Sequence, residues 1–480
     1  MKKIIALSAV AFLSTVSFAN TEANTEMQAQ IDELNAKIAK LEKKQATNTK
    51  GISRVNKLAN KDNIKFDVDF RTSYDNISYE TAGGQKETNT ALFSNRLWLG
   101  MGYAPTSTML FKGQLSVNKA FGAGGFTSTG TPQRGYGFDS FDWILNETLT
   151  DDSIKLREAY WLWTPTIGGF PTTFSVGRRP STNGFLGNLR EDDKDPKSPL
   201  AHVINMEFDG ASASIGLGKY VPGMSFKLCL GRGLTNARSW ANSTGMNYTE
   251  DDSTLDTADL MGFIFVPYDD GQYSIKTTAY RGFSLPGMTT NGTPADPTDD
   301  YMITQGNMDG AAISMLADGI GDEINDFLDE TKVFVSFAGT KSNPDDGKYM
   351  QGTQDSKTGY SYWVGTQMPN LTGGKFGLEY NHGSKYWRPF TYGEDTVIGS
   401  KMAVRGSAYE AYWSQPIITK GSDDVFSMQV RYTYLDYDFT GSNGFFGDYS
   451  APFDIDSAEA IGMNAVKNAQ DIRVYFRYRY

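Results

Sequence analysis

Basic side chains recur at alternate positions in several short segments of this 480-residue chain. In the segment 472–480, Arg473, Arg477 and Arg479 alternate with large apolar residues. Alternation of this kind places the two sets of side chains on opposite faces of a β-strand. A wall of arginine and lysine side chains can attract small anions or set ion selectivity, so this basic face is the first candidate for chemistry in the sequence.

The opposite register of the same segment is apolar and contains Ile472, Val474, Phe476, Tyr478 and Tyr480. The alternation recurs in the segments 64–71, 97–103, 111–117, 154–162, 226–230, 376–380 and 426–434. Within 154–162, the apolar register contains Ile154, Leu156, Tyr160 and Leu162. Segments of about ten residues with one apolar and one polar face are typical of the strands of a transmembrane β-barrel. We therefore expect an all-β fold, a closed antiparallel barrel whose apolar face contacts lipid.

The polar face of these registers carries the candidate pore-lining residues. They are Lys65, Asp67, Asp69, Arg71, Arg96, Lys112, Lys155, Arg157, Lys227, Lys276, Glu379, Arg431, Arg473, Arg477 and Arg479. Basic residues dominate this set, whereas the excess acid of the chain falls in loops such as 191–193, 250–252 and 299–300. A basic wall predicts a weak preference for anions. The alternative is that loop carboxylates fold inward and neutralise the bases, which would leave the pore nearly unselective.

The connections between these segments alternate between short turns and long loops. Short turns are expected at 104–107, 165–171, 221–223, 267–271 and 369–374, and long loops at 73–91, 119–153, 179–205, 233–256, 283–308, 383–403 and 438–470. Residues 61–480 are thus predicted to form about sixteen strands, with a range of about fourteen to eighteen. Residues 319–330 predict a brief helix within a turn, and residues 135–149 a loop that either narrows the barrel or covers it from outside.

The last strand of a closed barrel pairs with the first. We expect the outward apolar residues of the last strand to lie beside those of the first, which are Ile64, Phe66, Val68 and Phe70. On the inside, the three arginines of the last strand would face Asp67 and Asp69. The closing seam would then be matched in charge.

The N-terminal part of the chain has a different pattern. Residues 1–19 predict a secretory signal peptide, because Lys2 and Lys3 precede an apolar run that ends in small residues. In residues 20–60 a heptad pattern predicts a short α-helical coiled coil, with its seam at Ile31, Leu34, Ile38 and Leu41. Three roles stay open for it: self-association into a dimer or trimer, a periplasmic spacer that reaches towards peptidoglycan, and a solvated helical linker.

Other chemistry finds little support in the residue types. The chain has only two histidines, His202 and His382, and His382 lies near Asn381 and Ser384. Neighbours along one strand end do not form an oriented catalytic triad, so we expect no enzyme and interpret His382 as a hydrogen-bonding residue. Cys229 is the only cysteine, which excludes an intrachain disulfide, and the sequence predicts no metal site and no cofactor. The net charge of −11 argues against nucleic acid as a partner.

Several blocks of the sequence resemble known proteins. The aromatic end of the chain resembles that of bacterial outer-membrane porins, and the pair 156–160 and 175–180 is similar to two strands of substrate-selective porins. The blocks 198–202, 379–387 and 390–396 are similar to an uncharacterised porin-like family of Gram-negative bacteria. The resemblance to porins implies that Phe476, Tyr478 and Tyr480 form a signal for the barrel-assembly machinery, although Tyr replaces the commoner terminal Phe.

The expected function is passive diffusion of small hydrophilic solutes through the outer membrane by a homo-oligomeric, lipid-embedded barrel, with the N-terminal helix in the periplasm. One alternative is an envelope-structural or adhesive barrel that is tethered through its coiled coil. A barrel-borne hydrolase is the third class, and it has the least support.

Overall fold

The architecture is that of a computed structural model, which describes residues 64–123, 149, 152–193, 195–237, 255–289, 301–321, 324–420, 423–442 and 444–480. The predicted signal peptide and coiled coil lie outside these residues, as do residues 135–148 of the candidate constriction loop. Those assignments therefore stay predictions. Among the helices of the described residues, none combines the length and the apolar character needed to cross a membrane.

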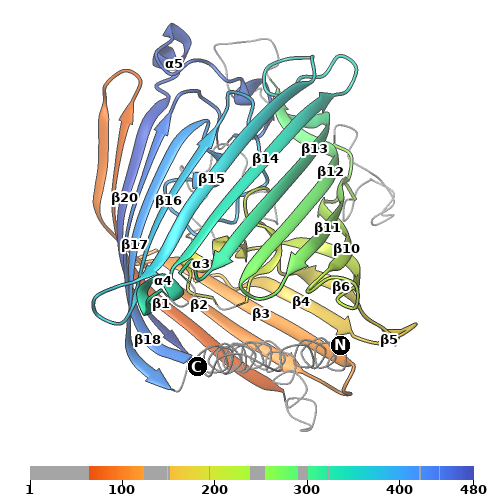
Figure 1. The fold of residues 1–480 in the computed structure, drawn as a ribbon. Helices are drawn as coiled ribbons and strands as arrows, with labels where there is room; N and C mark the ends of the chain where they lie inside the picture. Colours follow the sequence, from red (N-terminus) through yellow and green to blue (C-terminus); the bar gives the residue numbers. More distant parts are fainter. Residues whose placement is uncertain are drawn as a thin grey trace, which may run out of the picture. The chain divides into compact units, whose positions relative to one another are not determined.

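Sixteen strands form one closed antiparallel sheet, which Figure 1 shows as a barrel wall. Neighbouring strands pair in chain order, and β20 pairs with both β18 and β1, which closes the sheet. The predicted all-β barrel is confirmed, with the predicted number of strands. Its strands are β1 (Lys65–Thr81), β2 (Lys86–Tyr103), β3 (Met109–Ala120), β4 (Lys155–Trp163), β6 (Phe170–Arg179), β9 (Phe208–Gly216), β10 (Ser225–Leu234), β11 (Ala258–Asp269), β12 (Tyr273–Thr289), β13 (Tyr301–Asp318), β14 (Lys332–Pro344), β15 (Lys357–Pro369), β16 (Lys375–Gly383), β17 (Gly406–Lys420), β18 (Asp423–Tyr437) and β20 (Val466–Arg479).

Short elements occupy the connections between these strands. The turn from β13 to β14 contains α4 (Asp326–Asp329), which confirms the brief helix predicted there. The other short elements are β5 (Thr166–Ile167), β7 (Gly184–Phe185), α3 (Gly187–Arg190), β8 (Lys197–Leu200), η4 (Lys401–Ala403), β19 (Phe446–Gly447), η5 (Asp448–Ser450) and α5 (Ala458–Gly462).

Two of the predicted long loops contain long stretches of barrel strand, so those predictions were wrong in extent. β1 continues to Thr81 and β2 begins at Lys86, which turns most of the predicted loop 73–91 into a hairpin. Parts of β12 and β13 likewise lie within the predicted loop 283–308. Apolar alternation ends in these regions, but the backbone hydrogen bonds of the ladder continue because they need no apolar face.

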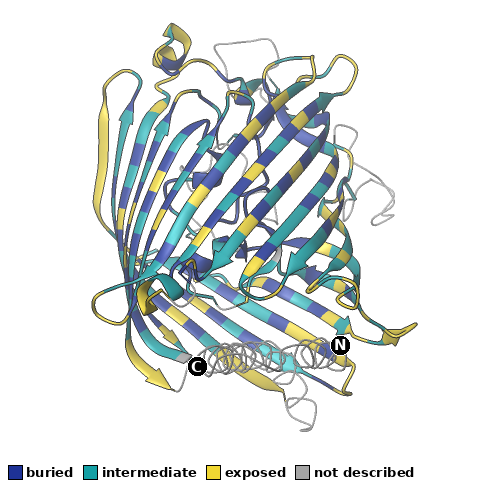
Figure 2. Cartoon of the chain, viewed as in Figure 1, coloured by how far each residue is buried: buried dark blue, intermediate teal, exposed yellow. Residues whose placement is uncertain are grey.

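Burial alternates along the barrel strands, with the polar register inside (Figure 2). In β18, Arg431 is 1% exposed, whereas its neighbours Val430 and Tyr432 are 37% and 41% exposed. In β20, Arg473 is buried and Ile472 is exposed. The apolar side chains therefore lie on the outer face, as the sequence predicts for a barrel whose exterior contacts lipid.

A β-bulge in β4 reverses the faces of its second half. The pairing of β4 with β3 shifts between Leu156 and Glu158, and both Arg157 and Glu158 are buried. Tyr160, which the sequence places on the outer register, is buried, and Trp161 is exposed instead. That prediction was wrong because one extra residue in a strand moves every later side chain to the other face.

The register of the closing seam differs from the prediction. Phe70 of β1 pairs with Tyr478 of β20, and Val68 exchanges two backbone hydrogen bonds with Tyr480. Phe66 therefore lies beyond the end of β20 rather than beside it. Apolar alternation specifies the face that a residue occupies, but not the number of residue pairs by which two strands are offset.

Opposite charges do face each other at this seam, but some of the partners differ from those predicted. The Arg477 guanidinium donates to the Asp69 carboxylate at 3.0 Å, as expected for the inner face. Arg473 pairs with Asp75 instead of Asp67 or Asp69, because the strands are offset. Asp75 shares the inward register of Asp69, farther along β1.

The outer face leads to a prediction about stability. Val474 occupies the outward register of β20 and pairs with Val430 and Tyr74 of the adjacent strands. If this face contacts lipid, Val474→Arg should lower the free energy of unfolding by about 2–4 kcal/mol. Guanidinium unfolding in lipid vesicles measures the change. Val474→Ile is the matched control and should cost less than about 1.5 kcal/mol; equal losses from both variants would place this face outside the lipid.

Candidate functional site

Two long connections fold against the inner wall of the barrel. We call them the β6–β9 segment (residues 180–207) and the β16–β17 segment (residues 384–405). Leu186 of the first and Trp387 of the second are fully buried. Such burial in connections, rather than in strands, shows that the interior of the barrel is packed with side chains.

Side chains of the wall hold the backbone of the β6–β9 segment. The Gln367 amide of β15 donates to the Leu189 carbonyl oxygen at 2.8 Å, and the Arg477 guanidinium of β20 donates to the Glu191 carbonyl oxygen at 2.7 Å. The Gln429 amide of β18 donates to the next carbonyl along, that of Arg190, at 2.8 Å. Buried backbone carbonyls need such partners when they are not part of a ladder. The segment is therefore anchored across three strands.

Asp395 of the β16–β17 segment contacts four arginines of the inner wall. Arg71 of β1 donates to its carboxylate through both terminal nitrogens, one of them at 2.8 Å. Arg473 of β20 and Arg96 of β2 lie 3.1 Å and 3.4 Å from the same carboxylate, and Arg431 of β18 donates to the Asp395 carbonyl oxygen at 2.9 Å. Burial alone would raise the pKa of the Asp395 carboxyl, but the guanidinium groups of Arg71 and Arg473 hold that pKa well below its ordinary value.

A second group of ion pairs joins both segments to the wall. Arg190 of α3 lies 2.8 Å from Glu394 and 3.4 Å from Glu410 of β17. Lys401 of η4 lies 2.6 Å from Glu379 of β16 and also contacts Glu410. None of these five side chains is more than 5% exposed. Buried charges of this kind are stable only with partners, so the two segments and the wall depend on each other.

The predicted pore-lining residues divide into three groups by exposure. The buried ones are Asp69, Arg71, Arg96, Arg157, Glu379, Arg431, Arg473 and Arg477. Lys155, Lys227, Lys276 and Arg479 are partly buried, and Lys65, Asp67 and Lys112 are exposed. The structure brings most of the buried group together through carboxylates of the two inward segments. That the residues line a water-filled pore stays a prediction.

The prediction of site residues did not include the loop carboxylates. Glu191 and Asp395 stand in acidic loops that are visible in the sequence, but nothing in those loops indicates that they fold inward. Asp75 has the same register as Asp69 and could have been found by extending the first strand. Glu410 lies in β17, a strand that the sequence pattern did not reveal. Within the described part of the chain, no group of three or more His, Cys, Asp or Glu side chains is arranged to hold a metal ion.

A family model described as Protein of unknown function (DUF3373) matches residues 86–480. The chain belongs to this family. The predicted resemblance to an uncharacterised porin-like family is thereby confirmed. No protein with a curated description matches the chain.

This DUF3373 protein is similar to several solved structures. One is Salmonella typhi OmpF in complex with daunomycin, with 12% identity and a TM-score of 0.45 over 87% of this chain and 98% of that chain. Pseudomonas putida OprB at high pH has 11% identity and a TM-score of 0.45 over 87% and 94% of the two chains. An anion-selective porin from Comamonas acidovorans has 11% identity and a TM-score of 0.44 over 87% and 100%.

Both histidines of this DUF3373 protein lie within hydrogen-bond distance of serine hydroxyls. His202 of the β6–β9 segment is 0% exposed, and its ring nitrogens lie 2.8 Å and 2.9 Å from the hydroxyls of Ser336 and Ser361. Burial lowers the pKa of His202 to about 3. His382 lies 3.3 Å from the Ser407 hydroxyl, whereas Ser384 accepts a hydrogen bond from a backbone amide of β15. Both ring nitrogens of His202 are thus engaged with serine hydroxyls in the packed interior.

Neutralising Asp395 tests the ion pairs at its carboxylate. In Asp395→Asn, Arg71 and its neighbours lose a shared negative charge while the side-chain volume is kept. Breaking a buried pair costs about 3–5 kcal/mol, so the free energy of unfolding should fall by that amount in denaturant titrations. The matched control is Asp456→Asn, because Asp456 is 73% exposed and its pair with Lys467 should contribute only about 0–1 kcal/mol. Similar losses in both variants would contradict the anchoring role of Asp395.

The burial of neutral His202 predicts a loss of stability in acid. Its pKa is about 3 in the folded protein, against about 6.5 in an unfolded chain, so the unfolded chain binds a proton that the folded one does not. The contribution of His202 to the free energy of unfolding is complete above about pH 6.5. Below that pH it falls by up to about 1.4 kcal/mol per pH unit. Denaturant titrations at several pH values measure this slope. His202→Gln should remove it and His382→Gln should keep it; an unchanged slope in His202→Gln would show that His202 is not its source.

Proposed function

We propose that this protein is an outer-membrane channel for the passive diffusion of small hydrophilic solutes. The observation that carries the proposal is the closed barrel with an exposed apolar exterior and a charged interior. A barrel that only has to be stable in lipid does not require a charged interior. In a channel, by contrast, interior charges attract water and polar solutes. Lys65, Asp67 and Lys112 are the charged side chains of the inward register that stay exposed, and they support a water-filled region inside the wall.

The selectivity that we propose is weak. The basic wall alone would favour anions, but Asp395 and Glu191 place carboxylates among Arg71, Arg431 and Arg473. Paired charges exert little field on a passing ion, so these contacts favour a nearly unselective pore over a strongly anion-selective one. Any preference for anions would then come from the exposed lysines Lys65 and Lys112.

We further propose that the exposed aromatic residues at the end of β20 interact with lipid and serve as the assembly signal. Phe476, Tyr478 and Tyr480 are 44%, 39% and 79% exposed on the outer face. The outer-membrane location, the signal peptide (residues 1–19) and the periplasmic coiled coil (residues 20–60) belong to the same proposal. So does a homo-oligomer, dimer or trimer, built through the coiled-coil seam or the barrel wall, with peptidoglycan as a ligand of the helix.

The packed interior gives the second candidate function its support. If the β6–β9 and β16–β17 segments close the lumen, the barrel would be a structural or adhesive component of the envelope. It would then be tethered through residues 20–60, and its external loops would bind the partner. Conductance separates this function from the first.

Single-channel recording of the mature protein, residues 20–480, in a planar bilayer tests both functions. The channel function predicts discrete openings with a reversal potential close to zero in a salt gradient. Asp395→Asn should shift that potential in the anion-selective direction, because it uncovers arginine charge, whereas the exposed-loop variant Asp456→Asn should not. A folded protein that never conducts would overturn the channel in favour of the structural function. A clearly cation-selective pore would contradict the role given to the basic wall.

A further inference from the structure

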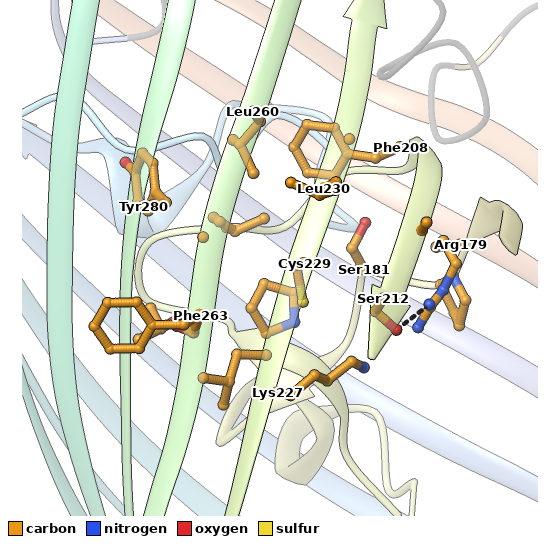
Figure 3. Close-up of a pocket in the computed structure, with 18 residues that line it drawn as sticks. Arg179, Ser181, Phe208, Ser212, Lys227, Cys229, Leu230, Leu260, Phe263 and Tyr280 are labelled. Atoms are coloured by element: carbon orange, nitrogen blue, oxygen red, sulfur yellow. Dashed lines mark hydrogen bonds between the residues drawn. The ribbon is translucent and has the colours of Figure 1, made fainter. Parts of the chain in front are cut away.

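A small cavity lies inside the barrel between the β6–β9 segment and the wall formed by β9, β10, β11 and β12 (Figure 3). Its volume is about 60 Å³. Much of its lining is apolar and includes Phe208, Leu260, Ile264 and Tyr280, each at most 8% exposed. Ile204 lines it from the side of the segment.

One end of this cavity is cationic. Arg179, at the end of β6, and Lys227 of β10 both line it, and Figure 3 shows the two side chains directed towards the same end, beside Ser212. Terminal nitrogen Nη1 of Arg179 donates to the Ser212 hydroxyl. The described residues that line the cavity include no aspartate or glutamate.

Among the residues that the structure describes, Arg179 lacks the carboxylate partner that the arginines at the closing seam have. Arg71, Arg96 and Arg473 each contact a carboxylate. Arg179 forms no ion pair within the described chain; its Nε, like those of Arg71 and Arg96, is buried without a hydrogen-bond partner there. A guanidinium without a counter-ion is costly to bury, and a bound anion would supply the counter-ion.

The two ends of the cavity together specify the chemistry of a ligand. A cationic end selects a carboxylate or a similar anion, and the apolar lining selects a hydrocarbon tail. The volume of 60 Å³ is well below the roughly 150 Å³ of an apolar cavity that holds benzene. The tail is therefore a short aliphatic chain and not an aromatic ring.

We propose that this cavity is a binding site for a short-chain aliphatic carboxylate such as propionate. The carboxylate contacts Arg179 and Lys227, and the alkyl chain packs against Phe208 and Leu260. This site goes beyond the proposed channel function, because it exists whether or not the barrel conducts. A channel that contains it would carry a local preference for small organic acids.

Titration of the folded, full-length mature protein with ¹³C-labelled propionate, followed by NMR, tests the site. Saturable binding is expected for propionate, and much weaker binding for propan-1-ol, chloride and benzoate, which lack the charge, the tail or the small size. Arg179→Gln should weaken propionate binding about tenfold or more, because it removes a charge-assisted hydrogen bond. Arg281→Gln is the matched control: Arg281 is an exposed arginine of β12 that pairs with Asp309, away from the cavity.

The thiol of Cys229 gives an independent readout, since Cys229 lines the cavity and is the only cysteine of the chain. Propionate should slow the reaction of this thiol with a small maleimide, and chloride at equal concentration should not. If Arg179→Gln fails to fold, Lys227→Met replaces it with the same expected loss. Wild-type binding by these variants, equal protection by chloride, or no protection by propionate would each overturn the proposal.

Discussion

The closure of the sheet between β1 and β20 is the constraint on which the rest of the structure depends. An unpaired backbone group in hydrocarbon costs several kcal/mol, so a sheet that spans a bilayer cannot have an open edge. The two backbone hydrogen bonds between Val68 and Tyr480, at 3.0 Å and 2.9 Å, extend the pairing of these strands to the aromatic end of β20. The alternation of residues 472–480 fits this requirement: each residue pairs through its backbone, while its side chain points either outward or into the barrel.

Closure also creates an electrostatic problem. The register places Arg71 opposite both Arg96 and Arg477, and it places Arg431 opposite Arg473. Like charges in directly opposed positions of a sheet destabilise it. Carboxylates between the arginines offset this repulsion. Asp69 and Asp75 of β1 supply two of them from the wall itself. The β6–β9 and β16–β17 segments bring Glu191 and Asp395 to these positions, so the inward folding of the two loops is a consequence of how the wall closes.

The sequence predicts those parts of the protein in which a local pattern carries the information. Alternation identifies the outward face of β18 and β20 and the inward position of Arg431 and Arg473, because the period of a strand is strict. The offset of the seam and the bulge at Arg157 are not local, since they depend on which backbone groups pair across strands. The partner of Arg71 is even harder to predict, because Asp395 is 324 residues away in the chain and lies in a loop without a periodic sequence pattern.

In the proposed channel, the same ion pairs limit where a solute can pass. Moving the β16–β17 segment out of the barrel would leave Arg71 and Arg473 without Asp395, and breaking one buried pair already costs about 3–5 kcal/mol. The segment is therefore part of the wall rather than a lid that opens and closes under thermal motion. A path for solutes has to run beside it, along inward side chains that already contact water. Lys65, Asp67 and Lys112 meet that condition. Selectivity would then be set by these few hydrated charges, because the arginines that dominate the sequence pattern are largely neutralised by the loops that they hold in place.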